Sequence, residues 1–206
     1  MPLDMVDTCL CMGAGITMAQ GFHWIDGEGT CFGFVGDSTF FASGMTGVVN
    51  AVYNNADMIL CVAIIRHGDD RSSAASGNRT EYDGTVRGQG RYCEVLEGIG
   101  VHMIVTVNPL DLDASVAAVQ ECAKLPGVKA IIFKSPCIAI SKPDGKCRIS
   151  EQCINCKKCI REIGCPALIT VDRNVTIDEN LCTGCGLCSQ ICPVHAIGGR
   201  YSKRRC

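Results

Sequence analysis

The stretch Cys153–Pro166, CINCKKCIREIGCP, is repeated with one change of spacing by Cys182–Pro193, CTGCGLCSQICP. Each run has three cysteines with two residues between neighbours, followed after a spacer by a fourth cysteine and a proline. The spacer before the fourth cysteine has five residues in the first run and three in the second. Such spacings let one tight loop place three thiolates around one face of an iron–sulfur cubane, whose fourth iron needs a distant ligand. The internal repeat therefore predicts two [4Fe-4S] clusters.

The segment resembles the bacterial two-cluster ferredoxin domain, in which the fourth cysteine of each run binds the cluster of the other run. The ligands predicted for one cluster are Cys153, Cys156, Cys159 and Cys192. The ligands predicted for the other cluster are Cys182, Cys185, Cys188 and Cys165. Gly184 and Gly186 suit a loop whose N–H groups turn toward sulfur, since glycine accepts the required dihedral angles. The resemblance implies an electron relay formed by two neighbouring clusters.

Structural zinc is the alternative interpretation of these runs, because four-thiolate zinc sites also use Cys-x2-Cys pairs. Zinc ribbons rarely place three cysteines at this spacing before Cys-Pro, and here the pattern occurs twice. Disulfides are disfavoured, because 206 residues can bury a core without them and the N-terminal residues do not have the pattern of a secretory signal. We therefore expect a cytoplasmic protein whose 17 cysteines are thiols or metal ligands.

Composition and charge exclude several other classes of protein. The net charge of -2 argues against a general nucleic-acid binder. No apolar run reaches the roughly 18 residues that a membrane-spanning helix needs. Hydrophobic residues make up 47% of the chain and charged residues 19%, which argues against a disordered protein. We expect a globular protein with no nucleic-acid or membrane partner.

The part of the chain before the cysteine runs alternates apolar stretches with helical patterns. The predicted strands are Thr30–Gly36, Asp57–Ile65, Val101–Val107 and Val128–Phe133. The predicted helices are 12–24, 45–55, 89–99 and 113–124. Strands that alternate with helices imply a parallel sheet covered on both faces. We predict an α/β domain at 1–145 and a small α+β ferredoxin-like domain at 146–206, with a hairpin that turns at Asp172–Asn174.

Two segments of the α/β domain have the composition of a phosphate and metal site. Cys9–Gly15 is a turn of small residues that opens a helix, where backbone N–H groups and the helix dipole favour an anion. Gly36–Phe41 directly follows a predicted strand and carries Asp37, whose carboxylate can hold Mg²⁺ beside a phosphate. Ligands of parallel α/β folds bind beyond the carboxyl ends of the strands. A glycine-rich turn and cap that serves packing is the plainer explanation of each segment taken alone.

The order of these motifs ahead of the ferredoxin repeat resembles one family. The motifs are Asp7–Ala14, Gly36–Gly44, Asn50–Asn54 and Ser135–Cys137. They are similar to the thiamine-diphosphate-binding C-terminal part of the indolepyruvate ferredoxin oxidoreductase alpha subunit. The resemblance implies a PP-type thiamine-diphosphate-binding α/β fold in which Asp37 binds Mg²⁺. The cofactor-binding residues that it implies are Cys11, Met12, Gly13, Ala14, Gly36, Asp37, Ser38 and Thr39.

The second Mg²⁺ ligand of the family is altered in this chain. Family members carry it in an Asp-Asn-x-Thr-Thr stretch after the next strand, whereas this chain has Asp69–Gly77 there, after a longer spacing. Asp70 takes the place of the asparagine and is the implied second oxygen ligand. The change would add a negative charge beside the diphosphate.

The resemblance implies oxidative decarboxylation of a 2-oxo acid, with coenzyme A as the acyl acceptor and ferredoxin as the electron acceptor. The implied partners are a beta subunit and a pyrimidine-binding half in other chains. No catalytic residue is assigned, because the glutamate that activates the aminopyrimidine belongs to that half. We therefore expect no activity from this chain alone. The alternative is a ferredoxin-like electron-transfer protein, or a scaffold, whose thiamine domain no longer binds the cofactor.

Overall fold

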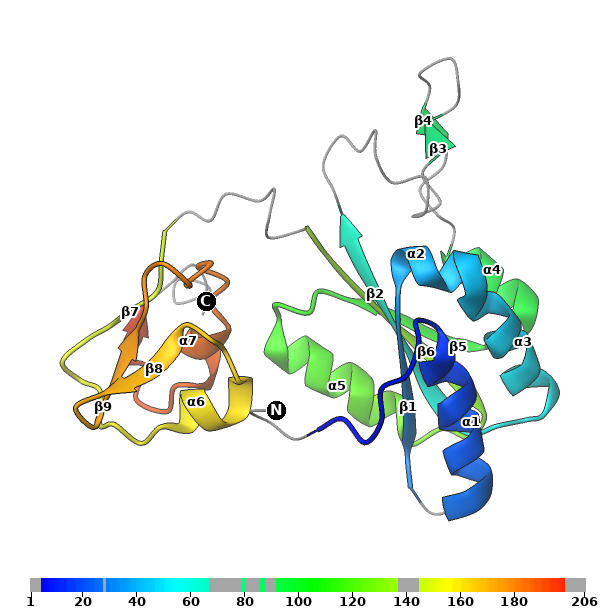
Figure 1. The fold of residues 1–206 in the computed structure, drawn as a ribbon, viewed down its shortest axis with the longest axis horizontal. Helices are drawn as coiled ribbons and strands as arrows, with labels where there is room; N and C mark the ends of the chain where they lie inside the picture. The colour runs from blue at the N-terminus through cyan, green and yellow to red at the C-terminus, as the bar shows by residue number, and fades with distance from the viewer. Residues whose placement is uncertain are drawn as a thin grey trace. The chain divides into compact units, whose positions relative to one another are not determined.

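The computed structural model describes residues 5–27, 29–66, 79–80, 86–87, 92–136 and 145–198. The chain divides into two compact units, one formed by Thr8–Ile140 and the other mainly by Ser141–Cys206 (Figure 1). The boundary predicted from the sequence lies between residues 145 and 146. Over the described ranges, no helix has both the length and the apolar character needed to cross a membrane.

The first unit is built on a four-stranded parallel sheet with the order β1-β2-β6-β5. Its strands are β1 (Cys31–Gly36), β2 (Met58–Arg66), β5 (Met103–Val107) and β6 (Val128–Pro136). All four correspond to the strands predicted from apolar runs, and the central pair, β2 and β6, is the longest. A short antiparallel pair, β3 (Arg79–Thr80) and β4 (Val86–Arg87), lies between β2 and β5 in the chain.

Helices cover both faces of the sheet, as the alternating pattern predicted (Figure 1). Helices α1 (Ala14–Asp26), α3 (Met45–Tyr53) and α4 (Tyr92–Ile99) pack with one face, and α5 (Leu112–Cys122) packs with the other. The buried residues of β2 alternate accordingly. Those facing the three-helix side are Met58, Leu60 and Val62, and those facing α5 are Ile59 and Cys61. A strand buried on both faces therefore has a continuous apolar sequence.

The segment between β1 and α3 differs from the predicted turn. It is helical throughout, as α2 (Asp37–Thr39) and a π-helical turn, η1 (Phe40–Gly44), that runs directly into α3. Phe40 is fully buried and packs against the ring of Tyr92 from α4, with ring centroids 5.5 Å apart. Burial of this ring fixes the strand-to-helix junction at Asp37. Short π-helical turns are frequent at functional sites.

Helix α1 lies unusually close to β1 because Gly33 has no side chain. A Cβ atom at Gly33 would lie 3.1 Å from the Gly15 carbonyl oxygen and 3.2 Å from the Ile16 Cα. Real Cβ atoms rarely approach backbone so closely, so a larger residue would force the helix away from the sheet. This close packing sets the position of the α1 N-terminus relative to the end of β1.

The second unit consists of small elements around the cysteine runs. They are β7 (Arg148–Ile149), α6 (Lys158–Ile163), β8 (Leu168–Val171), β9 (Asn174–Ile177), α7 (Leu187–Ile191) and β10 (Ile197–Gly198). Strands β8 and β9 form the predicted hairpin, whose two turn residues, Asp172 and Arg173, both have positive φ. Strands β7 and β10 pair antiparallel and were not predicted, because two-residue strands carry no periodic signal.

Candidate cluster and cofactor sites

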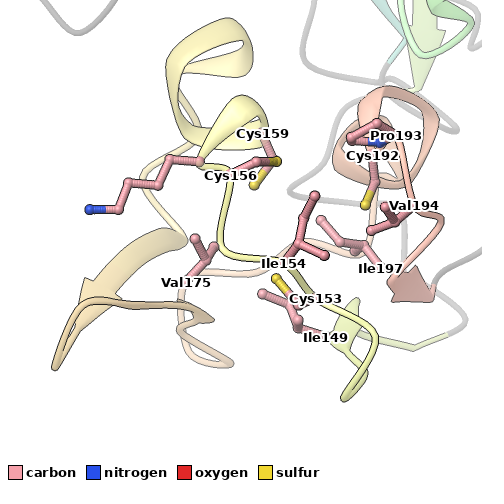
Figure 2. A pocket seen from close by; sticks show the side chains of 11 residues that line it. Ile149, Cys153, Ile154, Cys156, Cys159, Val175, Cys192, Pro193, Val194 and Ile197 are labelled. Carbon is pink, nitrogen blue, oxygen red and sulfur yellow. The ribbon is translucent and has the colours of Figure 1, made fainter.

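One cavity of the second unit is lined by the four cysteines predicted for the first cluster. These are Cys153, Cys156, Cys159 and Cys192. Figure 2 shows their side chains around one space, with Cys156 and Cys159 on one side and Cys153 on the opposite side. The rest of the lining is largely apolar and includes Ile149 and Ile197. The first run thus supplies three thiols to this cavity, and the second run supplies the fourth.

A second cavity has the reciprocal composition. Its cysteines are Cys147, Cys165, Cys182, Cys185 and Cys188. Three of these come from the second run, and Cys165 comes from the first run. Cys147 belongs to neither run and was not predicted to lie there. The structure therefore places the fourth cysteine of each run in the cavity of the other run.

The loops that carry the two triplets of cysteines share two left-handed positions. The second residue after the first cysteine is left-handed in both, as Asn155 (φ 53°) and Gly184 (φ 67°). The fourth residue is also left-handed in both, as Lys157 (φ 60°) and Gly186 (φ 80°). The glycines of the second loop were predicted from the sequence. Their counterparts in the first loop were not, because asparagine adopts the left-handed conformation less often than glycine does and lysine adopts it rarely.

Backbone N–H groups point at cysteine sulfurs in this unit. The Sγ of Cys182 accepts hydrogen bonds from the N–H of Cys147 and of Gly184, both at 3.4 Å. The Sγ of Cys192 accepts one from the N–H of Ala196 at 3.3 Å. Hydrogen bonds of this kind stabilise negative charge on thiolates and tune the potentials of iron–sulfur clusters.

The two metal interpretations require different arrangements of thiols. One zinc ion bound at about 2.3 Å would draw four sulfurs to within about 4 Å of one another. A cubane instead takes each thiolate at a different iron, so it needs thiols spread around a cavity. The donor set and its apolar surroundings fit [4Fe-4S] clusters.

In the first unit, the two segments predicted to contact the cofactor lie against each other. Gly13, at the start of α1, has φ 91°, and a Cβ there would lie 2.7 Å from the Ser43 Oγ. The Thr39 hydroxyl lies 3.8 Å from the Met12 sulfur. The turn before α1 thus packs on α2 and η1 at the carboxyl end of β1. Met12 is 85% exposed, so this part of the candidate site opens to solvent.

Asp37 occupies the first position of α2, directly after β1. Its Oδ1 accepts a hydrogen bond from the Ser38 N–H at 2.7 Å. Burial raises the pKa of the Tyr92 hydroxyl, and the negative charge of Asp37 raises it further. Tyr92 therefore stays protonated near the carboxylate. A carboxylate and the N-terminus of a thirteen-residue helix at the end of a parallel strand fit a Mg²⁺ ion and a diphosphate.

Some predicted residues lie outside the described part of the chain. They include Asp70, the implied second Mg²⁺ ligand, and Cys137 of the Ser135–Cys137 motif. Conversely, sequence reasoning missed Cys147 and Tyr92. Cys147 stands alone in the sequence, and Tyr92 comes from a helix far along the chain from Asp37, so neither residue had a spacing that could reveal it.

Two family models match the chain. The thiamine pyrophosphate enzyme C-terminal TPP binding domain matches residues 2–133, and the 4Fe-4S binding domain matches residues 175–198, which contain the second cysteine run. These matches confirm the predicted fold class, and they support thiamine diphosphate and [4Fe-4S] clusters as cofactors. The Mg²⁺ ion and the individual site residues remain predictions.

Curated relatives extend the similarity over nearly the whole chain. "Indolepyruvate oxidoreductase subunit IorA" of Archaeoglobus fulgidus is 31% identical over 95% of this chain and 33% of its own length. The subunit of the same name from Methanothermobacter thermautotrophicus is 33% identical over 95% of this chain and 32% of its own length. This chain thus spans about a third of the length of these relatives. The predicted resemblance to the indolepyruvate family is confirmed.

A solved structure of a putative thiamin diphosphate-dependent enzyme from Mycobacterium smegmatis also matches, with a TM-score of 0.44 and 14% identity over 62% of this chain and 22% of that chain. By its family model, its parallel sheet and its cysteine cavities, the chain belongs to the thiamine pyrophosphate enzymes, as their C-terminal TPP-binding domain followed by a 4Fe-4S binding domain.

Proposed function

We propose that this chain is the thiamine-binding and electron-transferring part of a 2-oxoacid:ferredoxin oxidoreductase of the indolepyruvate type. The observation that carries the proposal is the reciprocal lining of the two cavities, in which each run completes the site of the other. Two clusters bound this way lie within one small unit, and the same chain has a thiamine-binding fold. The coverage of 95% by indolepyruvate oxidoreductase subunits supports the same assignment.

The residues of the first unit would bind and orient the cofactor. Asp37 would hold Mg²⁺ through a carboxylate oxygen, and the turn Cys11–Ala14 would direct its N–H groups at the diphosphate. When bound, thiamine diphosphate supplies the nucleophilic carbon and the electron sink for decarboxylation of a 2-oxo acid. Exposed Met12 would then be covered by the cofactor or by the pyrimidine-binding half of the enzyme.

The residues of the second unit would hold the clusters, which take up and release single electrons when bound. Eight thiolates would bind them, with Cys192 and Cys165 as the crossed ligands. The apolar lining of the first cavity would limit access of water to its cluster. The proposed partners are a beta subunit, a pyrimidine-binding half and an external ferredoxin, with coenzyme A as the acyl acceptor. The proposed location is the cytoplasm.

Anaerobic purification followed by iron and sulfide analysis tests the electron-transfer part of the proposal. We expect about eight irons per chain, the number in two [4Fe-4S] clusters. Calorimetric titration with thiamine diphosphate and Mg²⁺, with the pyrimidine-binding half supplied, tests the other part. Asp37→Ala should abolish Mg²⁺-dependent binding, whereas Asp113→Ala, an exposed aspartate at the start of α5, should not. Full iron without cofactor binding would favour the alternative function, an electron-transfer protein or scaffold.

A further inference from the structure

The two cluster cavities differ by one thiol. The first cavity is lined by four cysteines, the number that one cubane binds. The second cavity is lined by five, because Cys147 joins the four predicted ligands. Both fourth ligands come from the other run, but the spacer before Cys165 is two residues longer than the spacer before Cys192. The extra thiol thus lies in the cavity whose crossed ligand has the longer spacer.

Cys147 is held firmly at this cavity. It is 2% exposed, and it precedes β7, which pairs with β10. Its backbone N–H donates to the Cys182 Sγ at 3.4 Å. Its side chain lines the same cavity as the thiols of Cys182 and Cys188. The neighbours of Cys147 in this cavity are therefore themselves predicted cluster ligands.

Cys165 reaches the same group of thiols from another direction. It follows α6, which ends at a left-handed Gly164 (φ 61°), and it is only partly buried. It lines the same cavity as Cys147 and Cys188. A cluster bound there by Cys182, Cys185 and Cys188 would therefore have two thiols available for its fourth iron.

We propose that Cys147 is an alternative fourth ligand of the second cluster, able to replace Cys165. In the exchange, the Cys165 sulfur leaves the iron as a thiolate and takes up a proton from solvent. The Cys147 thiol loses its proton to solvent, and its sulfur forms the bond to that iron. The iron keeps one thiolate throughout, and no electron is transferred. This inference rests on the proposed function only in that it requires two [4Fe-4S] clusters.

The test compares alanine variants of the two crossed ligands in the full chain, purified anaerobically. Cys165→Ala should keep about eight irons, because Cys147 completes the second cluster. The matched variant Cys192→Ala should lose about half of the iron, because the lining of its cavity holds no fifth cysteine. Cys147→Ala should keep about eight irons, and the double variant Cys147→Ala/Cys165→Ala should keep about four.

Electron paramagnetic resonance of the dithionite-reduced variants provides a second readout. Cys165→Ala should keep the spectrum of two interacting clusters, and the double variant should show one isolated cluster. The first cluster also reports that the unit is folded. A Cys165→Ala variant that loses the second cluster, or both clusters, would overturn the inference. A wild-type chain without about eight irons would instead overturn the proposed function.

Discussion

The two units of this chain are stabilised by different kinds of core. The α/β unit buries aliphatic and aromatic side chains on both faces of its sheet, with Phe40, Leu60 and Ile131 fully buried. Among the described residues, the hydrophobic cluster of the second unit has eight buried members, and four of them are cysteines. These are Cys147, Cys159, Cys188 and Cys192. The first unit therefore has a hydrophobic core of its own, whereas we expect the stability of the second unit to depend on what its thiols bind.

The backbones of the two units also differ, in their number of left-handed residues. Six described non-glycine residues have positive φ, and only Asn55 lies in the α/β unit. The other five lie in the second unit, and they are Asn155, Lys157, Asp172, Arg173 and His195. Left-handed conformations cost free energy for residues with a side chain, so the surrounding structure must compensate for them. The comparison indicates that cluster binding supplies much of the stability of the second unit.

Iron removal should have the largest effect. Chelation under anaerobic, reducing conditions is expected to unfold the second unit, because its cysteines would lose the bonds that connect the two runs. The α/β unit should keep its fold. Amide hydrogen exchange measures both outcomes, with fast exchange expected at Val175 of β9 and unchanged protection at Leu60 of β2. Persistent protection at Val175 without iron would show that the two units do not differ in this way.

Gly33→Val should have the largest effect among substitutions in the α/β unit. The new side chain would collide with the Gly15 carbonyl oxygen and separate α1 from β1, at a cost of about 3 kcal/mol. Trp24, the single tryptophan of the chain, lies in α1, so its fluorescence reports urea unfolding of this unit. The control is Gly21→Ala in α1, where a Cβ meets nothing within 4 Å. It should stabilise the unit by roughly 0.5–1 kcal/mol. Equal changes in the free energy of unfolding for Gly33→Val and Gly21→Ala would argue against close packing of α1 on β1.

Alkaline pH should weaken the α/β unit through a buried thiol. Burial raises the pKa of Cys61 to about 12 from 9.0, with a smaller contribution from Cys122. The folded state thus keeps its proton above pH 9, where the unfolded state loses it, so stability is complete below pH 9 and falls as pH rises. The loss should reach about 2 kcal/mol at pH 10.5. In urea unfolding, the free energy of unfolding of Cys61→Ala should fall less steeply with pH than that of the wild type. An unchanged slope would show that Cys61 is not the group responsible.

Sequence patterns predicted the α/β unit better than the second unit, for a physical reason. The segment Met58–Val62 of β2 is buried on both faces and reads as a continuous apolar run. The spacing of the cysteine runs predicted which thiols would share a cavity. The π-helical turn at Phe40–Gly44 and the position of Cys147 depend on contacts between distant segments, so no local pattern could reveal them.

Lys157→Gly should have a small effect, a gain in the stability of the second unit. Lys157 has φ 60° at a loop position where the second run has Gly186, so glycine should relieve the left-handed strain. We expect a gain of about 1 kcal/mol, and a loss of about 1 kcal/mol for the reciprocal Gly186→Ala. The urea midpoint for loss of visible cluster absorbance measures both changes.

Asn155→Gly separates backbone strain from side-chain bonding in the same loop. Asn155 is also left-handed, but its side chain accepts a hydrogen bond from the Val175 N–H and donates one to the Asn174 side chain, both at 2.9 Å. Asparagine tolerates this conformation better than lysine does, and glycine would lose both bonds. The variant should therefore be less stable than wild type, opposite in sign to Lys157→Gly. A gain at both positions would show that the bonds to β9 contribute little and that backbone strain alone distinguishes the two runs.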